Sequence, residues 1–225
     1  MNNRIALSWS GGKDCCMALD TLISQGFEVV CLVTTVPTEL GRTFGHGERT
    51  EMIKLQGEAL NIPVHFIECT YENYTSQFVN AVEYLKNQLN VTGIAYGDLY
   101  LDEHREWGEK VAAAADVEAL YPLWMKKEEA LPSLGKFVQS GYEAIVIRVR
   151  EDVLNDTWLG RIVDESFLRD VQQTTICPMG EAGEYHTFVY DGPLFLRRIQ
   201  LEQGELIQLE TTKKLEFKSY SLMER

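Results

Sequence analysis

Short apolar runs alternate with longer amphipathic segments through the first half of the chain. The apolar runs are nearly continuous, which is typical of buried strands in a parallel sheet. They predict strands at Ile5–Ser8, Glu28–Thr35, Val64–Glu68, Thr92–Tyr96 and Asp116–Leu120. The segments between them predict helices, one ending at Gly26 and the others over Glu48–Leu60, Asn73–Leu89 and Leu101–Ala115. This alternation predicts an α/β fold, a doubly wound parallel sheet of about five strands with the first strand central.

The pattern changes after residue 120. A helix is predicted over Lys127–Ser140, a strand over Tyr142–Val149 and a further helix over Glu165–Gln172. Short strands of a meander are predicted to follow at Tyr185–Tyr190, Leu194–Gln200 and Leu206–Phe217. The change predicts two domains, the α/β domain over residues 1–120 and a smaller α+β domain over residues 121–225.

A glycine-rich turn follows the first predicted strand, from Ser8 to Gly12. A strand-to-helix turn leaves backbone N–H groups at the helix start, where the helix dipole attracts anions. Glycine lets the backbone approach an anion closely, because no Cβ intervenes. Ser10 adds a hydroxyl donor and Lys13 adds a cation. The turn, with Gly11 and Gly12 at its tip, is therefore a candidate pocket for phosphate or pyrophosphate, although it does not fit the Walker A spacing.

Carboxylates lie close to this turn and to the end of the fourth predicted strand. Asp14 follows Lys13. Gly97 and Asp98 follow the fourth predicted strand, which ends at Tyr96. The carboxyl ends of parallel strands meet at one sheet edge, so Asp98 should lie near the glycine turn. Asp14 and Asp98 are candidate Mg²⁺ ligands. Spacing alone supports equally well that Asp98 or Asp102 caps the next helix.

A second polar cluster lies at Gly180-Glu181-Ala182-Gly183-Glu184-Tyr185-His186-Thr187. Glu184 and His186 share a face if the segment is extended, and a carboxylate beside an imidazole can perform acid–base chemistry. The spacing by itself favours a plainer interpretation, a polar turn that leads into an edge strand.

Composition narrows the classes of function. The formal net charge is −13, which opposes non-specific binding to nucleic acid or to an anionic membrane. The five cysteines form no C-x-x-C pair, which argues against a disulfide framework or a zinc ribbon. No apolar run is long enough to span a bilayer, and no signal-peptide pattern is visible. A reducing cytoplasm is the expected compartment, and no membrane partner is expected.

The loop Ser10-Gly11-Gly12-Lys13-Asp14 resembles the SGGKDS loop of the PP-loop ATP pyrophosphatases, with Cys15 in place of the final serine. Further segments resemble, in the same order, one branch of that superfamily, the diphthine–ammonia ligase family: AYGD ending at Asp98, YPLW from Tyr121, WLGR from Trp158 and GEAGEYHTFVYDGP from Gly180. The last departs from the family pattern at Ala182, which replaces a glycine. The resemblance covers nearly the whole chain. It implies an N-terminal HUP-type ATP-binding domain and a C-terminal substrate-binding domain.

The resemblance also implies an activity, an ATP-dependent, AMP- and pyrophosphate-forming ligase that adenylates a carboxylate and transfers ammonia to it. It implies catalytic roles for Lys13, Asp98 and Glu184, and substrate contacts from Glu181, Glu184 and His186. ATP would be bound by a larger set: Ser8, Ser10, Gly11, Gly12, Lys13, Asp14, Cys15 and Gly97. Mg²⁺ would bind Asp14 and Asp98.

The acceptor acid is not identified by the sequence, and both a small molecule and a protein side chain are open. Two other functions are alternatives to the amide ligase. One is a tRNA-modifying PP-loop enzyme, which the acidic charge disfavours, and the other is a non-catalytic nucleotide sensor of the same fold. A homodimer that pairs through the C-terminal meander is a further expectation.

Overall fold

The computed structural model describes residues 3–38, 41–209 and 211–225. Contacts group the chain into two units. The first comprises Met1–Ser10 and Asp14–Trp124, and the second comprises Gly11–Lys13 and Met125–Arg225. The domains predicted over residues 1–120 and 121–225 stay a prediction, because grouping by contacts does not test which parts fold alone.

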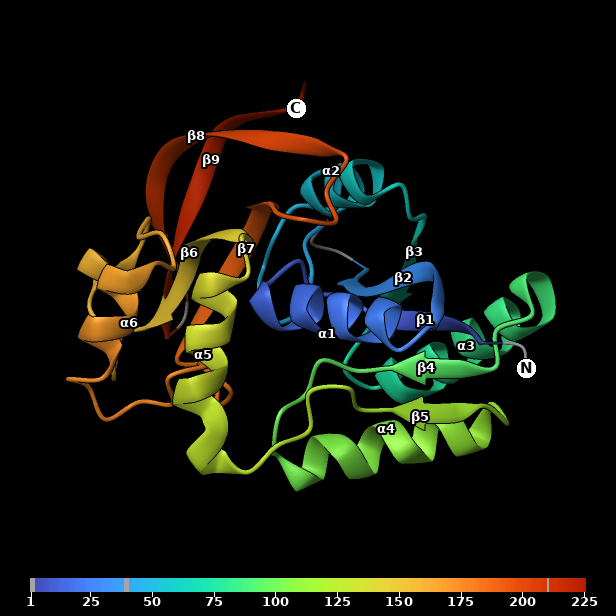
Figure 1. Ribbon diagram of the computed structural model, residues 1–225. Coiled ribbons are helices and arrows are strands. Elements are labelled where there is room, and N and C mark those ends of the chain that lie inside the picture. The colour runs from blue at the N-terminus through green and yellow to red at the C-terminus, as the bar shows by residue number, and fades with distance from the viewer. Residues whose placement is uncertain (1–2, 39–40, 210) are drawn as a thin grey trace. The chain divides into compact units, whose positions relative to one another are not determined.

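The first unit contains a five-stranded parallel sheet with the order β3-β2-β1-β4-β5 (Figure 1). The strands are β1 (Arg4–Ser8), β2 (Glu28–Pro37), β3 (Val64–Cys69), β4 (Gly93–Ala95) and β5 (Glu118–Leu120). The continuous apolar runs form these strands because both faces of the sheet are covered. The predicted α/β class, the strand number and the central position of β1 are confirmed.

Four helices cover this sheet. They are α1 (Lys13–Ser24), α2 (Thr50–Leu60), α3 (Tyr74–Leu89) and α4 (Asp102–Ala114). The chain runs from β1 to β3 in one direction and then returns through β4 to β5, so right-handed crossovers place α1 and α2 on one face and α3 and α4 on the other. Phe78 and Val82 of α3 and Val111 of α4 share one hydrophobic cluster with Ala6 of β1 and Ile94 of β4.

The second unit contains a four-stranded antiparallel sheet with the order β7-β6-β9-β8. Its elements are a 3₁₀ turn η1 (Lys127–Glu129), α5 (Ala130–Gln139), β6 (Glu143–Arg150), a 3₁₀ turn η2 (Asp156–Trp158), α6 (Glu165–Val171), β7 (Tyr185–Asp191), β8 (Arg197–Gln208) and β9 (Thr212–Glu224). Helix α5 buries Ala130, Leu134 and Phe137, which recur at helical spacing. The predicted smaller α+β part is confirmed.

The predicted meander is wrong in its last two strands. The structure has a long hairpin, β8 and β9, in place of short strands at Leu194–Gln200 and Leu206–Phe217, and β7 lies beside β6 rather than beside β8. Most side chains of β8 are exposed on both faces, so the strand lacks the alternation that marks a half-buried strand. Residues 208–213 contain no glycine or proline that would indicate the turn between these strands, and residue 210 lies outside the described residues.

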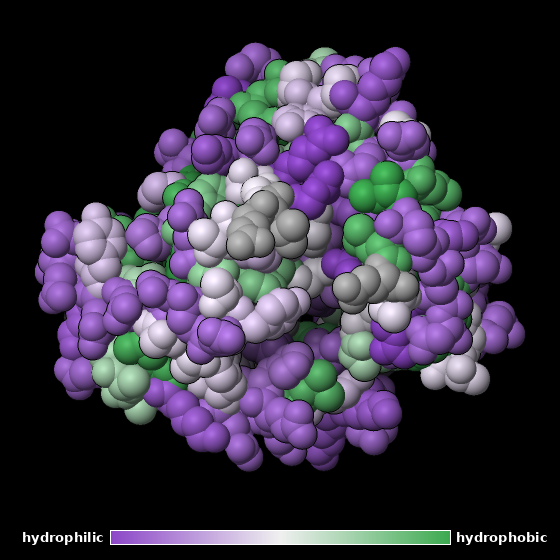
Figure 2. All heavy atoms as spheres, turned by 180° about the vertical axis from the view of Figure 1, so that it is seen from behind, coloured by the Kyte–Doolittle hydropathy of each residue, from purple (hydrophilic) through white to green (hydrophobic). Residues whose placement is uncertain are grey.

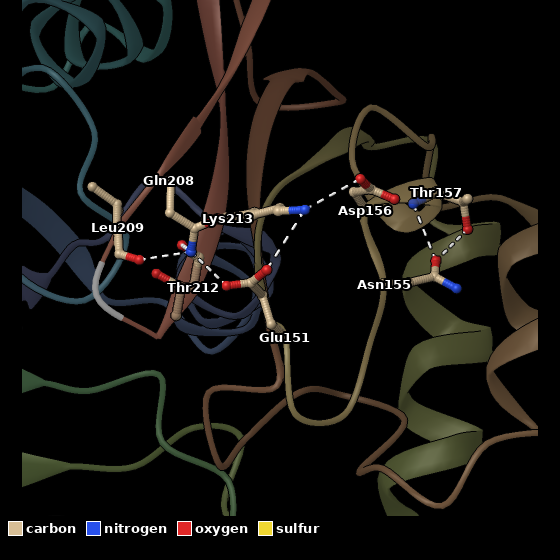
Figure 3. A network of polar contacts seen from close by, with 8 residues as sticks. All are labelled: Glu151, Asn155, Asp156, Thr157, Gln208, Leu209, Thr212 and Lys213. Carbon is tan, nitrogen blue, oxygen red and sulfur yellow. Dashed lines mark hydrogen bonds and ion pairs between the residues drawn. The ribbon is translucent and has the colours of Figure 1, made fainter.

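Polar contacts join this turn to the segment that follows β6 (Figure 3). Lys213 Nζ lies 3.3 Å from Asp156 Oδ2 and 3.6 Å from Glu151 Oε1. Gln208 Nε2 donates to the carbonyl of Leu209 at 2.8 Å and to that of Thr212 at 3.3 Å. Exposed ion pairs of this kind contribute little stability.

The face shown in Figure 2 is mostly hydrophilic, with only small hydrophobic areas. Among the helices of the described residues, none combines the length and the apolar character needed to cross a membrane.

Candidate functional site

The carboxyl ends of β1 and β4 form the switch point of the parallel sheet, where the direction of chain progression reverses. The two strands are neighbours, with Leu7 paired to Ala95. A Cβ built on Gly97 would lie 3.3 Å from both the carbonyl carbon of Asp14 and the nitrogen of Cys15. The Gly97 backbone therefore packs closely against the first turn of α1. Ligands of open α/β sheets bind at this kind of edge.

Trp9 fixes the direction in which the chain leaves β1. Its side chain is buried, and its backbone N–H donates to the carbonyl of Val33 at 2.8 Å. The indole Nε1–H donates to Gln56 Oε1 at 2.9 Å, and the hydroxyl of Thr34 donates to the Trp9 carbonyl at 2.7 Å. These bonds lie in the core, so Ser8 and Ser10 on either side of Trp9 are held by a rigid base.

The tip of the glycine turn bonds to β7 within the second unit. Gly11 has φ of +83°, a left-handed conformation that favours glycine. Its carbonyl accepts from the N–H of Val189 at 2.9 Å. The backbone N–H of Lys13 donates to Thr187 Oγ1 at 3.0 Å. One of the N–H groups expected for an anion is therefore bonded to a threonine hydroxyl, a contact that the sequence did not indicate.

The side chain of Lys13 is 2 % exposed and has two neighbours of its own unit. Its ammonium donates to the carbonyl of Met179 and lies 4.8 Å from the centroid of the Tyr185 ring. The Tyr185 hydroxyl donates to the carbonyl of Pro178 at 2.6 Å, which fixes the ring.

Glu184 closes the loop that carries these Lys13 contacts. The carboxylate is 7 % exposed, and it accepts from the N–H of Cys177 at 3.0 Å and from the N–H of Ala182 at 2.9 Å. It lies just before β7, whereas His186 lies inside that strand. Glu181 and His186 are half-buried. The geometry gives Glu184 a positioning role toward Met179, while substrate or catalytic roles for Glu181, Glu184 and His186 stay predictions.

The Asp98 carboxylate contacts a histidine of the helix that follows it. Its Oδ1 lies 3.0 Å from Nδ1 of His104, in the first turn of α4. His104 was missed by the sequence reasoning, because the contact depends on the turn before α4, which spacing alone does not give. The alternative that Asp98 or Asp102 caps the helix is wrong, because Leu101 is the N-cap residue and no side chain caps it.

Aromatic side chains that the sequence reasoning also missed support the Gly97 segment. The rings of Tyr96 and Tyr121 stack with centroids 5.4 Å apart. The Tyr121 hydroxyl donates to the carbonyl of Arg105 at 2.8 Å, and the Arg105 guanidinium lies 4.9 Å from the Trp124 ring. Stacked rings with a satisfied hydroxyl form a stiff support, so the position of Gly97 and Asp98 is well determined.

Cys15 lies beside Ser10 in the first turn of α1. The serine hydroxyl donates to Cys15 Sγ at 3.7 Å. Burial raises the pKa of the Cys15 thiol, but hydrogen bonds from Cys16 and Ser10 outweigh it and leave that pKa below its usual value. Burial raises the pKa of Cys16 well above the usual value and that of Cys31 to about 11.

Cys15 should therefore be alkylated at a lower pH than Cys31, although both side chains are 3 % exposed. The thiolate is the nucleophile, and it predominates only above the thiol pKa. Mass spectrometry of the native protein after iodoacetamide treatment across a pH series should show modification of Cys15 first. In urea the difference should vanish, and Cys31 reacting first in the native protein would contradict the assignment.

Comparison with known proteins gives matches across almost the whole chain. Residues 3–119 match the family described as "Diphthamide synthase N-terminal domain", and residues 130–223 match "Diphthamide synthase C-terminal domain". Proteins named diphthine–ammonia ligase are similar to it. The one from Danio rerio is 27% identical over 88% of this chain and 86% of its own, and the one from Homo sapiens is 27% identical over 91% and 85%. The one from Schizosaccharomyces pombe is 29% identical over 88% of this chain and 36% of its own length.

Proposed function

The chain belongs to the diphthamide synthase family, and we propose that it is an ATP-dependent ligase that converts a carboxylic acid and ammonia into an amide. The names of its relatives support an acid–ammonia ligase. The observation that carries the proposal is the buried, oriented ammonium of Lys13 on a glycine turn that leaves the central strand.

The proposed reaction has two steps. A carboxylate oxygen of the acceptor attacks the α-phosphorus of ATP, and the bond to the bridging oxygen of pyrophosphate breaks. Ammonia then attacks the acyl carbon, the bond to the AMP oxygen breaks, and the nitrogen loses a proton. Negative charge grows on the departing pyrophosphate in the first step. A cation and N–H donors fixed in advance stabilise such charge at little cost of reorganisation.

Each residue near the turn has a proposed task in this scheme. Lys13 would bind the β- and γ-phosphates, with Gly11 and Gly12 allowing close approach of the backbone. Ser10 would add a hydroxyl donor. Ser8, Asp14, Cys15 and Gly97 complete the proposed nucleotide-binding set. The Cys15 thiol is a weaker hydrogen-bond donor than a hydroxyl, so its contact with the nucleotide would be the weakest of this set.

The residues also fit a magnesium ion. Asp14 and Asp98 supply carboxylate oxygens, the ligands that Mg²⁺ prefers. The close contact of Gly97 with the Asp14 backbone supports their proximity. Bound there, the ion would neutralise phosphate charge. His104 would orient the Asp98 carboxylate through the 3.0 Å contact between its Nδ1 and Asp98 Oδ1.

The acceptor is proposed only by class, as a carboxylic acid on a small molecule or on a protein side chain. Glu181, Glu184 and His186 are the candidate contacts for the acceptor or for ammonium. The net charge of −13 disfavours nucleic acid as that partner. A cytoplasmic location agrees with five free cysteines.

Isotope exchange tests this proposal most simply. The protein is incubated with ATP, Mg²⁺, labelled pyrophosphate and a panel of carboxylic acids, diphthine included, without ammonium. With an acid that the protein adenylates, reversal of the first step should incorporate labelled pyrophosphate into ATP. When ammonium is added, the reaction should proceed to the amide and release AMP. Formation of ADP would contradict the mechanism. Tight ATP binding without exchange for any acid would favour a nucleotide sensor.

A further inference from the structure

The two sheets have four edge strands, and three of them are protected. β5 has only three residues. In β7 the N–H of Val189 donates to the Gly11 carbonyl. β8 is interrupted by irregular register around Gln203, and its Glu202 pairs with Lys218 at 3.0 Å. Bulges, charges and short length are the usual means by which natural sheets avoid pairing with other chains.

The remaining edge, β3, is longer than β5 and is not interrupted by a bulge. It has six residues, contains no proline and pairs with β2 without a break in register. The Pro63 carbonyl accepts from the N–H of Leu32 in β2, and the Cys69 carbonyl accepts from the N–H of Thr38, the residue after β2. In a parallel pair, successive residues alternate in the side to which their N–H and C=O point. The backbone groups of Val64, Phe66 and Glu68 therefore point away from β2, and no other strand of the described residues pairs there.

A groove runs beside this edge, between β3 and α2. Its larger cavity has a volume of about 450 Å³ and is lined by Lys54, Gly57, Val64 and Phe66, among others. A smaller cavity of about 210 Å³ shares Lys54 and Phe66 and extends to Glu68. The open backbone edge is thus bordered by a hollow that side chains can fill.

Lys54 and Glu68 are exposed and oppositely charged on this surface. The ammonium of Lys54 lies 5.8 Å from the centroid of the Phe66 ring. Within residues 3–38, 41–209 and 211–225, neither Lys54 nor Glu68 forms an ion pair. An unpaired cation and an unpaired anion on one edge make that edge able to complement a copy of itself.

We propose that β3 pairs antiparallel with β3 of a second copy of this chain, about a two-fold axis at Phe66. The pairing joins two five-stranded sheets through the backbone groups of Val64, Phe66 and Glu68. Phe66 faces Phe66 of the partner subunit, and Val64 faces Glu68 of the partner subunit. Directly opposed side chains lie on the same sheet face. The partner's Glu68 therefore approaches Lys54, and the symmetry forms this pair twice.

This proposal is independent of the catalytic proposal and differs from the dimer that the sequence suggested through the C-terminal strands. Light scattering after gel filtration should give twice the chain mass. Lys54→Glu and Glu68→Lys should each raise the dimer dissociation constant by about ten- to a hundredfold, because both symmetric pairs become repulsive. Both side chains are exposed, so neither variant should affect folding.

Mixing the two single variants provides the decisive control. In a mixed dimer, the substituted side chain at position 54 of one subunit faces the oppositely charged substituted side chain at position 68 of the other. The second contact keeps the native pair of Lys54 and Glu68, so association should return, as it should in the Lys54→Glu, Glu68→Lys double variant. Hydrogen exchange should show Val64, Phe66 and Glu68 amides protected at dimer concentrations only. A monomeric wild-type protein, or dimers that ignore both charge reversals, would overturn the proposal.

Discussion

Lys13→Ala is expected to lower the rate of AMP formation by at least about a hundredfold, the loss typical when one preorganised charge-stabilising group is removed. Lys13 is buried, and the Met179 carbonyl and the Tyr185 ring fix its ammonium in one place. Alanine supplies no cation at that position. Single-turnover measurement with an accepted acid isolates the adenylation step, and circular dichroism checks that the variant is folded.

Lys110→Ala is the matched control, because the Lys110 side chain is 77% exposed and lies 3.8 Å from the Glu106 carboxylate on the surface of α4. It should leave AMP formation unchanged. Lys13→Arg keeps the charge but not the compact shape, so it should retain only part of the activity. If Lys13→Ala reacted at a rate within about twofold of the wild-type rate, Lys13 would not be the group that binds the leaving pyrophosphate.

Gly180→Ala is expected to have the second large effect, on stability and activity together. Gly180 has φ of +68°, and a Cβ there would lie 2.9 Å from the Tyr185 ring and 2.9 Å from the Tyr185 carbonyl oxygen. The left-handed conformation costs about 1 kcal/mol, and relief of the clash adds about 1–3 kcal/mol. Because Tyr185 borders Lys13, displacement of its ring should also lower activity. Urea unfolding and AMP formation measure the two effects.

Gly26→Ala separates the two costs. Gly26 has φ of +85°, but a Cβ there would meet nothing within 4 Å. This variant should lose only about 1 kcal/mol of unfolding free energy and keep its activity. Equal losses for Gly26→Ala and Gly180→Ala would show that the contact with Tyr185 has no energetic consequence.

The parallel sheet could be predicted because its strands are buried on both faces. Apolar runs such as Glu28–Thr35 then stand out against amphipathic helices, and the switch point follows from their order. Boundaries were less certain, as α2 begins at Thr50 rather than at the predicted Glu48. The β8–β9 hairpin could not be placed, because its exposed strands carry polar residues on both faces.

The sequence indicated the glycine turn but not what holds it. The carbonyl of Met179 lies 166 residues from Lys13 in the chain, and a backbone acceptor leaves no mark on residue type. Glu184 was singled out for chemistry, yet its carboxylate bonds to two backbone N–H groups. The Asp98–His104 pair needed the turn geometry before α4, which spacing alone does not give.

A crystal structure of the protein with a non-hydrolysable ATP analogue and Mg²⁺ tests the central claim most directly. We predict that the β- and γ-phosphates lie at the glycine turn, within hydrogen-bonding distance of Lys13 Nζ, with the metal near Asp14 and Asp98. Phosphates bound away from residues 10–14, or an analogue that does not bind at all, would contradict the account.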